Sequence, residues 1–216
     1  PLSGTLDTPG PMARSVEDCA LLLLAMQGAD PADPHTLVLR DSDPMPLLRR
    51  GVKGLRLARL PETERAGVDA DILASYDQSL RILAGMGAEI VDLTLPATLR
   101  EFGNRVGQII SAEVYALIGD IADNNSLPVD EAVRPRVRAG AAISAATYLR
   151  TLAEREQMKE NFRAAMTGID ALLTPTSLTP AIPVASVDQN SSPAFSTRWV
   201  NLLDLCALAV PNGLTP

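Results

Sequence analysis

Histidine and cysteine are scarce in this sequence, and their shortage argues against several kinds of site. The 216 residues include one histidine, His35, and two cysteines, Cys19 and Cys206. A zinc or iron centre needs several such ligands close together, so we expect no metal and no cofactor. Both cysteines lie in apolar stretches, where we interpret them as small buried side chains in a reducing compartment. This interpretation favours the cytoplasm.

Positive charge and aromatic side chains are also in short supply. The formal net charge is −7, and phenylalanine, tryptophan and tyrosine make up 3% of the residues. A nucleic-acid surface needs a basic face and rings for base stacking, so no nucleic acid is expected as a partner. No apolar run approaches the roughly 20 residues of a membrane-spanning helix, so no membrane partner is expected either.

Two well-known catalytic patterns are missing as well. The sequence has no glycine-rich phosphate loop and no Gly-x-Ser-x-Gly turn. A Ser-His-Asp triad would have to use His35, which follows Pro34 in a polar loop. We therefore interpret His35 as a surface residue and expect no such triad.

Periodic patterns predict helices and strands in alternation through the first half. Ser15 followed by Asp18 predicts a capped helix that runs to Gly28. Apolar residues lie all round this helix, so we expect it to be buried on most sides. Alternation at 55–60 and again at 89–95 predicts two strands, and the helix between them predicts that they run parallel.

The second half predicts mainly helices, with two short strands near its end. The expected elements are a helix at 99–122, a short helix between Pro128 and Pro135, a long helix capped by Ser144 and closed by Gly168, a strand at 171–176, a helix at 199–205 and a buried strand at 207–210. We also expect a lobe boundary within 30–46. The whole pattern predicts an α/β fold in which helices cover a mixed β-sheet on both faces.

One proline-braced segment is the most distinctive part of the chain. Residues 6–18 resemble the Leu-Asp, Gly-Pro, Ala-Arg-Ser/Thr-Val-x-Asp run of amidase signature hydrolases. Further stretches resemble the same family in the same order, namely 51–56, 85–95, 170–176 and 201–213. The resemblance covers essentially the whole chain. It implies an α/β/α sandwich in which residues 1–216 are the later half of a single domain, truncated at both ends.

The resemblance also implies a chemistry. Amidase signature enzymes hydrolyse a carboxylic amide to a carboxylate and ammonia or an amine, through a Ser-Ser-Lys triad. The family carries that triad in its earlier half, beside a Gly-Gly-Ser-Ser-Gly-Gly loop that this sequence lacks. The two lysines, Lys53 and Lys159, do not have the required neighbours. We therefore assign no catalytic residue and expect this chain alone to be inactive towards its small-molecule amide substrate.

Four residues are candidates for the wall of a substrate pocket. Asp7 belongs to the most family-like motif, although it could simply cap the adjacent turn. Arg136 lies where some relatives place an arginine for a substrate carboxylate, although it could be a solvent-facing charge. Thr174 and Thr176 follow a strand, where sites in α/β proteins gather, although plain strand-end polarity would also explain them.

Other functions remain open at this point. The chain could be a non-catalytic amidase-like scaffold or binding module, and it could associate as a homo-oligomer. Residues 201–205 resemble allophanate hydrolases. Those enzymes bind the substrate carboxylate with a tyrosine, but the corresponding position in this sequence falls near Val106. A valine cannot bind a carboxylate, so this assignment is less favoured. The middle helices lack the tyrosine-rich and serine-rich stretches of the tRNA-dependent amidotransferase subunits. The sequence therefore favours that subgroup less.

Overall fold

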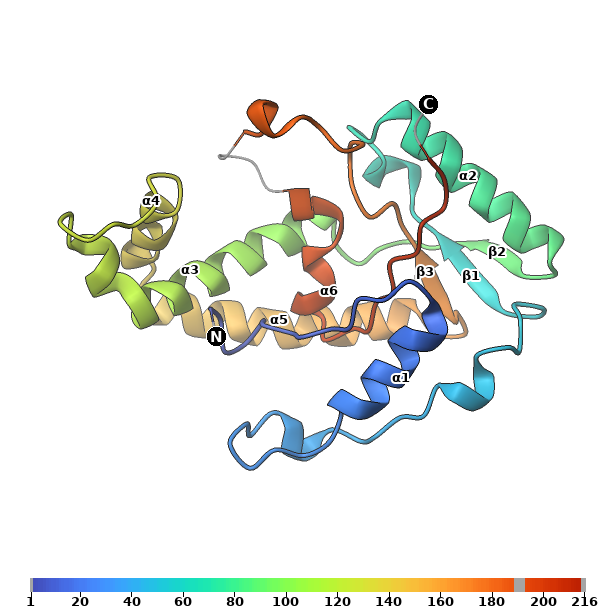
Figure 1. The fold of residues 1–216 in the computed structure, drawn as a ribbon, viewed down its shortest axis with the longest axis horizontal. Helices are drawn as coiled ribbons and strands as arrows, with labels where there is room; N and C mark the ends of the chain where they lie inside the picture. Colours follow the sequence, from blue (N-terminus) through green and yellow to red (C-terminus); the bar gives the residue numbers. More distant parts are fainter. Residues whose placement is uncertain (1, 189–192, 215–216) are drawn as a thin grey trace. The chain divides into compact units, whose positions relative to one another are not determined.

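Three parallel strands form the sheet around which most of the chain is organised (Figure 1). The computed structural model describes residues 2–188 and 193–214. Its strands are β1 (Arg56–Arg59), β2 (Glu89–Asp92) and β3 (Ala171–Leu173), in the order β2-β1-β3. Its helices are α1 (Val16–Met26), α2 (Ala70–Gly85), α3 (Leu99–Asp123), α4 (Arg134–Arg138), α5 (Ala145–Ala165) and α6 (Arg198–Leu202).

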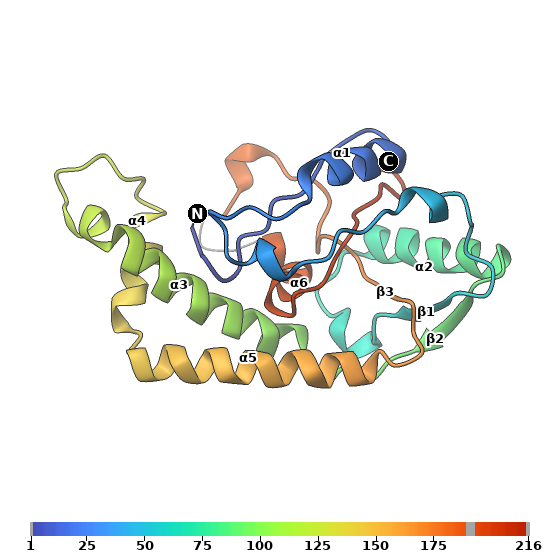
Figure 2. The same ribbon diagram turned by 90° about the horizontal axis from the view of Figure 1, so that it is seen from below.

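The sheet confirms the predicted α/β class. Leu57 in the central strand pairs with Ile90 of β2 and with Ala171 of β3, and both pairings are parallel. The sheet lies between α2 and the C-terminal end of α5 in both Figure 1 and Figure 2. All strands of the described residues are parallel, so the antiparallel strand that a mixed sheet implies is not among them.

The main core forms where α3, α5 and α6 meet. Phe102 and Ile109 of α3 are fully buried, as is Leu202 of α6. The rings of Phe162 on α5 and Trp199 on α6 lie 5.6 Å apart between centroids. Aromatic rings bury large apolar areas, so this contact ties α6 to α5. The sequence predicts these helices correctly because their apolar residues recur at helical spacing.

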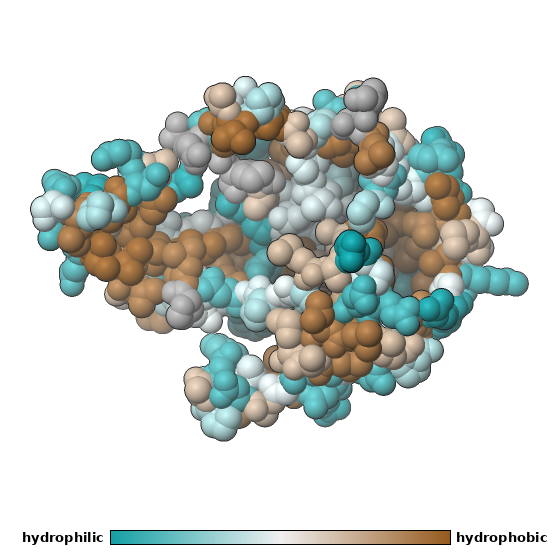
Figure 3. Space-filling view, viewed as in Figure 1, coloured by the Kyte–Doolittle hydropathy of each residue, from teal (hydrophilic) through white to brown (hydrophobic). Residues whose placement is uncertain are grey.

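The predicted apolar stripe of α3 is only partly buried. Phe102, Val106 and Val114 lie in the core, whereas Leu117 and Ile121 are 56% and 46% exposed. Ile118 interrupts the helix with a non-helical φ of −132°. Figure 3 shows the resulting apolar surface at the end of the molecule formed by α3 and α4.

Arg134 holds α4 against the end of α3. Its buried guanidinium donates hydrogen bonds to the carbonyl oxygens of Ala122 at 2.6 Å, Asn124 at 3.0 Å and Leu127 at 2.7 Å. The last carbonyls of a helix have no partner within the helix, and this arginine supplies one for Ala122.

The chain divides into two compact units. Residues 1–7 and 54–216 form the larger unit, and residues 8–53 form the smaller one. The boundaries fall at positions 7/8 and 53/54, so the expected boundary within 30–46 is wrong.

Helix α1 belongs to the smaller unit and begins as predicted, because the Ser15 hydroxyl accepts the Asp18 N–H at 3.0 Å. The prediction that it is buried on most sides is wrong. Ala20 is its only buried residue, and Leu21, Leu22 and Leu23 are 41–49% exposed. The small unit adds only short 3-10 turns around α1, which cannot cover its circumference.

Two further predictions near the C-terminus are wrong. Residues 207–210 form no strand with any described residue, and all four are exposed. Cys206 is also exposed rather than buried, while Cys19 is half-buried. A strand forms only beside a partner strand, so an apolar run without one stays extended and open to solvent.

Candidate functional site

A large cavity opens at the carboxyl end of β3. It has a volume of about 1060 Å³ and is bordered by α2, the second half of α5, β3 with the residues after it, and residues 196–212. Ile72, Leu80, Phe162 and Leu172 are among its apolar lining residues. Ligands of α/β proteins gather at the carboxyl ends of parallel strands, so this cavity is the candidate site.

Thr174 and Thr176 both line the cavity, as the sequence leads us to expect of a site at this strand end. Thr174 is half-buried and Thr176 is exposed. Neither hydroxyl has a hydrogen-bond partner within the described part of the chain. Both hydroxyls are therefore free to donate to or accept from a polar group in the cavity.

Tyr76 joins the end of β3, which borders this site, to Leu60, the residue that follows β1. Its hydroxyl donates to the carbonyl oxygen of Leu173 at 2.9 Å and accepts the Leu60 N–H at 2.8 Å. Burial raises the pKa of the Tyr76 hydroxyl, which therefore stays protonated at neutral pH. Periodicity in the sequence marks Tyr76 only as part of an apolar stripe. The sequence signal that could have revealed this role is a tyrosine within a stripe of aliphatic residues, because a buried hydroxyl needs hydrogen-bond partners.

Lys159 is the lysine that borders the cavity, and it is ion-paired. Its Nζ lies 2.8 Å from Asp204 Oδ2 and 2.9 Å from Glu156 Oε2. Burial acts to lower the pKa of Lys159, but its bonds to Asp204 and Glu156 outweigh burial and raise it. Its amine therefore stays protonated and is unsuited to act as a base.

Asp204 anchors the end of α6 to α5. It pairs with Arg155 as well as with Lys159, and Arg155 also donates to the Leu202 carbonyl at 2.8 Å. The backbone of Asp204 has a φ of 52°, the left-handed region that favours glycine. The two ion pairs hold a non-glycine residue in this conformation, directly before residues 205–212 on the cavity wall.

Asp7 and Arg136 lie outside the cavity. The carboxylate of Asp7 accepts the backbone N–H groups of Leu2 and Ser3 and closes the turn that precedes it. Arg136 is exposed on α4. The structure thus brings Thr174 and Thr176 together at one cavity and places Asp7 and Arg136 elsewhere in the larger unit.

Glu113 of α3 fixes the start of the chain. Its carboxylate accepts hydrogen bonds from the hydroxyls of Ser3, Thr5 and Tyr148, the last at 2.6 Å, and from the Thr5 N–H at 3.1 Å. Burial acts to raise the pKa of Glu113, but these hydrogen bonds outweigh burial and lower it. The carboxylate therefore stays ionised and serves as a structural acceptor.

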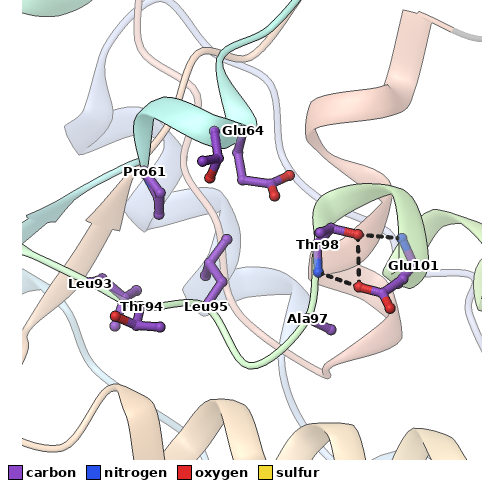
Figure 4. A pocket seen from close by; sticks show the side chains of 9 residues that line it. Pro61, Glu64, Leu93, Thr94, Leu95, Ala97, Thr98 and Glu101 are labelled. Carbon is purple, nitrogen blue, oxygen red and sulfur yellow. Dashed lines mark hydrogen bonds between the residues drawn. The ribbon is translucent and has the colours of Figure 1, made fainter.

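A second, smaller cavity lies where α3 begins (Figure 4). It has a volume of about 350 Å³, and Glu64, Thr98 and Glu101 are among its lining residues. Thr98 and Glu101 form a reciprocal capping box, and Glu64 accepts the Leu99 N–H at 2.9 Å. The first amides of α3 are thus bonded to side chains of the protein itself, so we interpret this cavity as structural.

The described residues offer neither a metal site nor a membrane span. No three His, Cys, Asp or Glu side chains there gather closely enough to hold a metal ion. None of the helices in the described ranges is both long and apolar enough to span a membrane.

Comparison with known proteins gives the family. A family model described as Amidase matches residues 1–215. The chain belongs to the amidase family. Members of this family are hydrolases and amidotransferases that act on carbon–nitrogen bonds.

One curated member of the amidase family similar to this chain is a glutamyl-tRNA(Gln) amidotransferase subunit of Geobacter metallireducens. It is 30% identical over 243 aligned positions, which cover 99% of this chain and 50% of the relative. The chain therefore spans about half the length of the curated relatives it matches.

Solved structures of other proteins show the same fold. A chain from a vestigial protein complex, described as revealing the origins of an s-triazine catabolic enzyme, matches with a TM-score of 0.82 and 24% identity. That match covers 94% of this chain and 45% of the other. The allophanate hydrolase of Kluyveromyces lactis matches with a TM-score of 0.65 and 26% identity, over 74% of this chain and 27% of that one.

Proposed function

We propose that this chain is the later half of one amidase domain, truncated at both ends, whose full-length form hydrolyses a carboxylic amide. The products are a carboxylate and ammonia or an amine. The observation that carries the proposal is the family match over residues 1–215 in a chain half as long as its relatives. In the full-length protein, the nucleophile and its base come from the half that this chain does not contain.

In this proposal, the chain supplies the frame and part of the wall of the amide pocket. Thr174 and Thr176 support the role best, since both hydroxyls are unpartnered among the described residues and border the large cavity. We propose that they hydrogen-bond a polar group of the substrate. Asp7 is already engaged by backbone amides, so we propose that its role is to hold the turn. Arg136 would contact a substrate only if the full-length protein extended the pocket to α4.

The test uses the full-length protein and a panel of simple aliphatic and aryl amides, with ammonia or amine release as the readout. Thr174→Val keeps the shape of the side chain and removes one hydrogen bond, which is worth about 0.5–1.5 kcal/mol. We expect KM to rise about three- to tenfold with little change in kcat. Thr179→Val is the matched control, because Thr179 is exposed and outside the cavity lining. Absence of hydrolysis across the panel would refute the proposed activity.

A second candidate function is that of an amidotransferase component. The sequence of the middle helices disfavours this function, yet curated relatives of about 30% identity are subunits of glutamyl-tRNA(Gln) amidotransferase. The two functions differ in whether the reaction requires an acceptor. A simple amidase releases ammonia from its amide at full rate, whereas an amidotransferase component requires partner subunits and an acceptor.

A further inference from the structure

The charged side chains that border the large cavity cancel one another. Among the described residues they are two cations and two anions, namely Lys159, Arg163, Asp170 and Asp204. A charged ligand is normally held by a free side chain of opposite sign, because burial of an unpaired charge is costly. The class of ligand therefore depends on whether any of these four side chains is free to bind it.

Both cations are already paired within the described chain. Lys159 Nζ lies 2.9 Å from Glu156 Oε2 and 2.8 Å from Asp204 Oδ2, and its side chain is only 15% exposed. Arg163 pairs with Glu160 on the same helix at 2.5 Å, and its side chain is 65% exposed. Solvent screens a charge as exposed as that of Arg163. Neither cation is therefore available to attract an anionic group into the cavity.

Both anions are engaged as well. Asp204 is bound by Arg155 and by Lys159, as described above. The Asp170 carboxylate accepts the Arg56 N–H at 2.7 Å. A cationic group would therefore compete for carboxylates that already have partners.

Most of the remaining wall is apolar. Leu80 and Leu83 line the cavity from α2, Phe162 and Met166 from the end of α5, and Leu172 from β3. The cavity volume of about 1060 Å³ is large for an amide group alone, since pockets of about 300–1,000 Å³ hold drug-sized ligands. The wall thus has an apolar surface that a small polar amide would leave uncovered.

We propose that the amide substrate carries a large, uncharged apolar group, such as a long alkyl chain or an aryl ring, which fills this cavity. The polar amide then lies by Thr174 and Thr176, whose hydroxyls are unpartnered among the described residues. A substrate with a carboxylate or an ammonium group in the cavity would lose its hydration without gaining a free counter-charge. This inference rests on the proposed amidase function and narrows its substrate class.

The first test measures kcat/KM of the full-length protein for acetamide, butanamide, hexanamide and octanamide. N-octylacetamide is included because it places the chain on the amine side. Each buried methylene should raise kcat/KM about threefold, so octanamide or N-octylacetamide should exceed acetamide by at least about 100-fold. The monoamide of octanedioic acid has the length of octanamide and a terminal carboxylate, so its kcat/KM should be at least about 100-fold lower than that of octanamide. A flat series, or a preference for the carboxylate, would overturn the proposal.

Glu156→Gln tests the role of the paired charges. Glu156 is exposed and lies outside the cavity lining, but its loss leaves Lys159 with one partner fewer and adds an uncompensated positive charge at the wall. The kcat/KM of the octanedioic monoamide relative to octanamide should therefore rise at least about threefold. Glu154→Gln is the matched control on the same helix, because its partner Arg105 does not line the cavity, and the ratio should not change. Equal ratios in the two variants would contradict the proposal.

Binding separates this inference from the proposed activity. Calorimetric titration of the full-length protein with octanamide, N-octylacetamide and the octanedioic monoamide needs no turnover. Binding of an apolar amide without hydrolysis of any amide refutes the proposed function and leaves the apolar ligand class standing. Hydrolysis of acetamide without binding or turnover of the long amides overturns the inference and leaves the proposed function standing. Neither binding nor hydrolysis would overturn both.

Discussion

Two acidic residues, Glu113 and Asp204, hold the ends of the described chain in place. Glu113 on α3 binds the turn at Ser3 and Thr5, and Asp204 after α6 is bound by Arg155 and Lys159 of α5. Each carboxylate has more than one donor, and charge-assisted hydrogen bonds are stronger than neutral ones. Both residues therefore give predictions at the residue scale.

Glu113→Gln should destabilise the chain by about 1 kcal/mol at pH 7, because the neutral amide accepts hydrogen bonds less strongly and adds an unwanted donor. The pKa of Glu113 is lowered in the folded state, since its hydrogen bonds outweigh burial. Its contribution is therefore fully present above the unfolded pKa of about 4.3 and is lost as the pH falls through the lower folded value.

Urea denaturation from pH 7 to pH 3.5 measures this difference. The gap between wild type and Glu113→Gln should narrow as the pH falls. Glu131→Gln is the control, because Glu131 is exposed and its side chain makes no hydrogen bond or ion pair with a described residue. A gap that stays constant over this range would contradict the assigned cause.

Asp204 gives a prediction that separates its backbone from its side chain. Asp204→Ala and Asp204→Gly both remove the two ion pairs, but only glycine adopts the φ of 52° without strain. The alanine variant should therefore be less stable than the glycine variant by about 1 kcal/mol. Thermal unfolding of the alanine and glycine variants measures this difference in stability. Equal unfolding midpoints would show that the backbone is not strained at this position.

At the scale of elements, caps and close contacts decide where helices start and how they pack. Ser15, Thr98 and Ser144 each accept an N–H in the first turn of the helix that follows, and the sequence identifies the serine positions directly. Local hydrogen bonds of this kind depend on residues three apart, so they can be read from sequence alone.

Gly140, in the turn after α4, lies directly against α3. A Cβ built on Gly140 would lie 1.9 Å from the Ser111 carbonyl oxygen and 2.5 Å from the Tyr115 Cβ. Gly140→Ala should therefore cost about 2 kcal/mol or more, since the backbone has to move. Gly107→Ala on α3 meets nothing within 4 Å and should be neutral or stabilising.

Urea denaturation of the two alanine variants measures this contrast. Equal stability of the two variants would mean that α3 and the segment after α4 are not packed as described.

What the sequence could not predict depends on contacts between distant elements. The strand at 56–59 and the long helices follow from periodicity, which is local. The exposure of Leu22 on α1 and of Leu208 depends on whether another element covers them, and periodicity does not carry that information. Thr174 and Thr176 can be proposed from the sequence because they follow a predicted strand. The positions of Tyr76 and Asp204 depend on partners far along the chain, which periodicity does not reveal.

At the scale of the whole molecule, the chain has the fold of an amidase and about half of its relatives' length. The large cavity, the open edge of β3 and the uncovered residues 207–210 occur together in the larger unit. These features fit our proposal that the nucleophile and its base lie outside this chain.

The measurement that tests this central claim most directly is amide turnover by the pure 216-residue chain. We predict no release of ammonia or amine above the uncatalysed rate from any carboxamide, while the full-length protein is active under the same conditions. Turnover by the isolated chain that survives removal of all contaminants would contradict the claim, because the nucleophile and base would then lie within these residues.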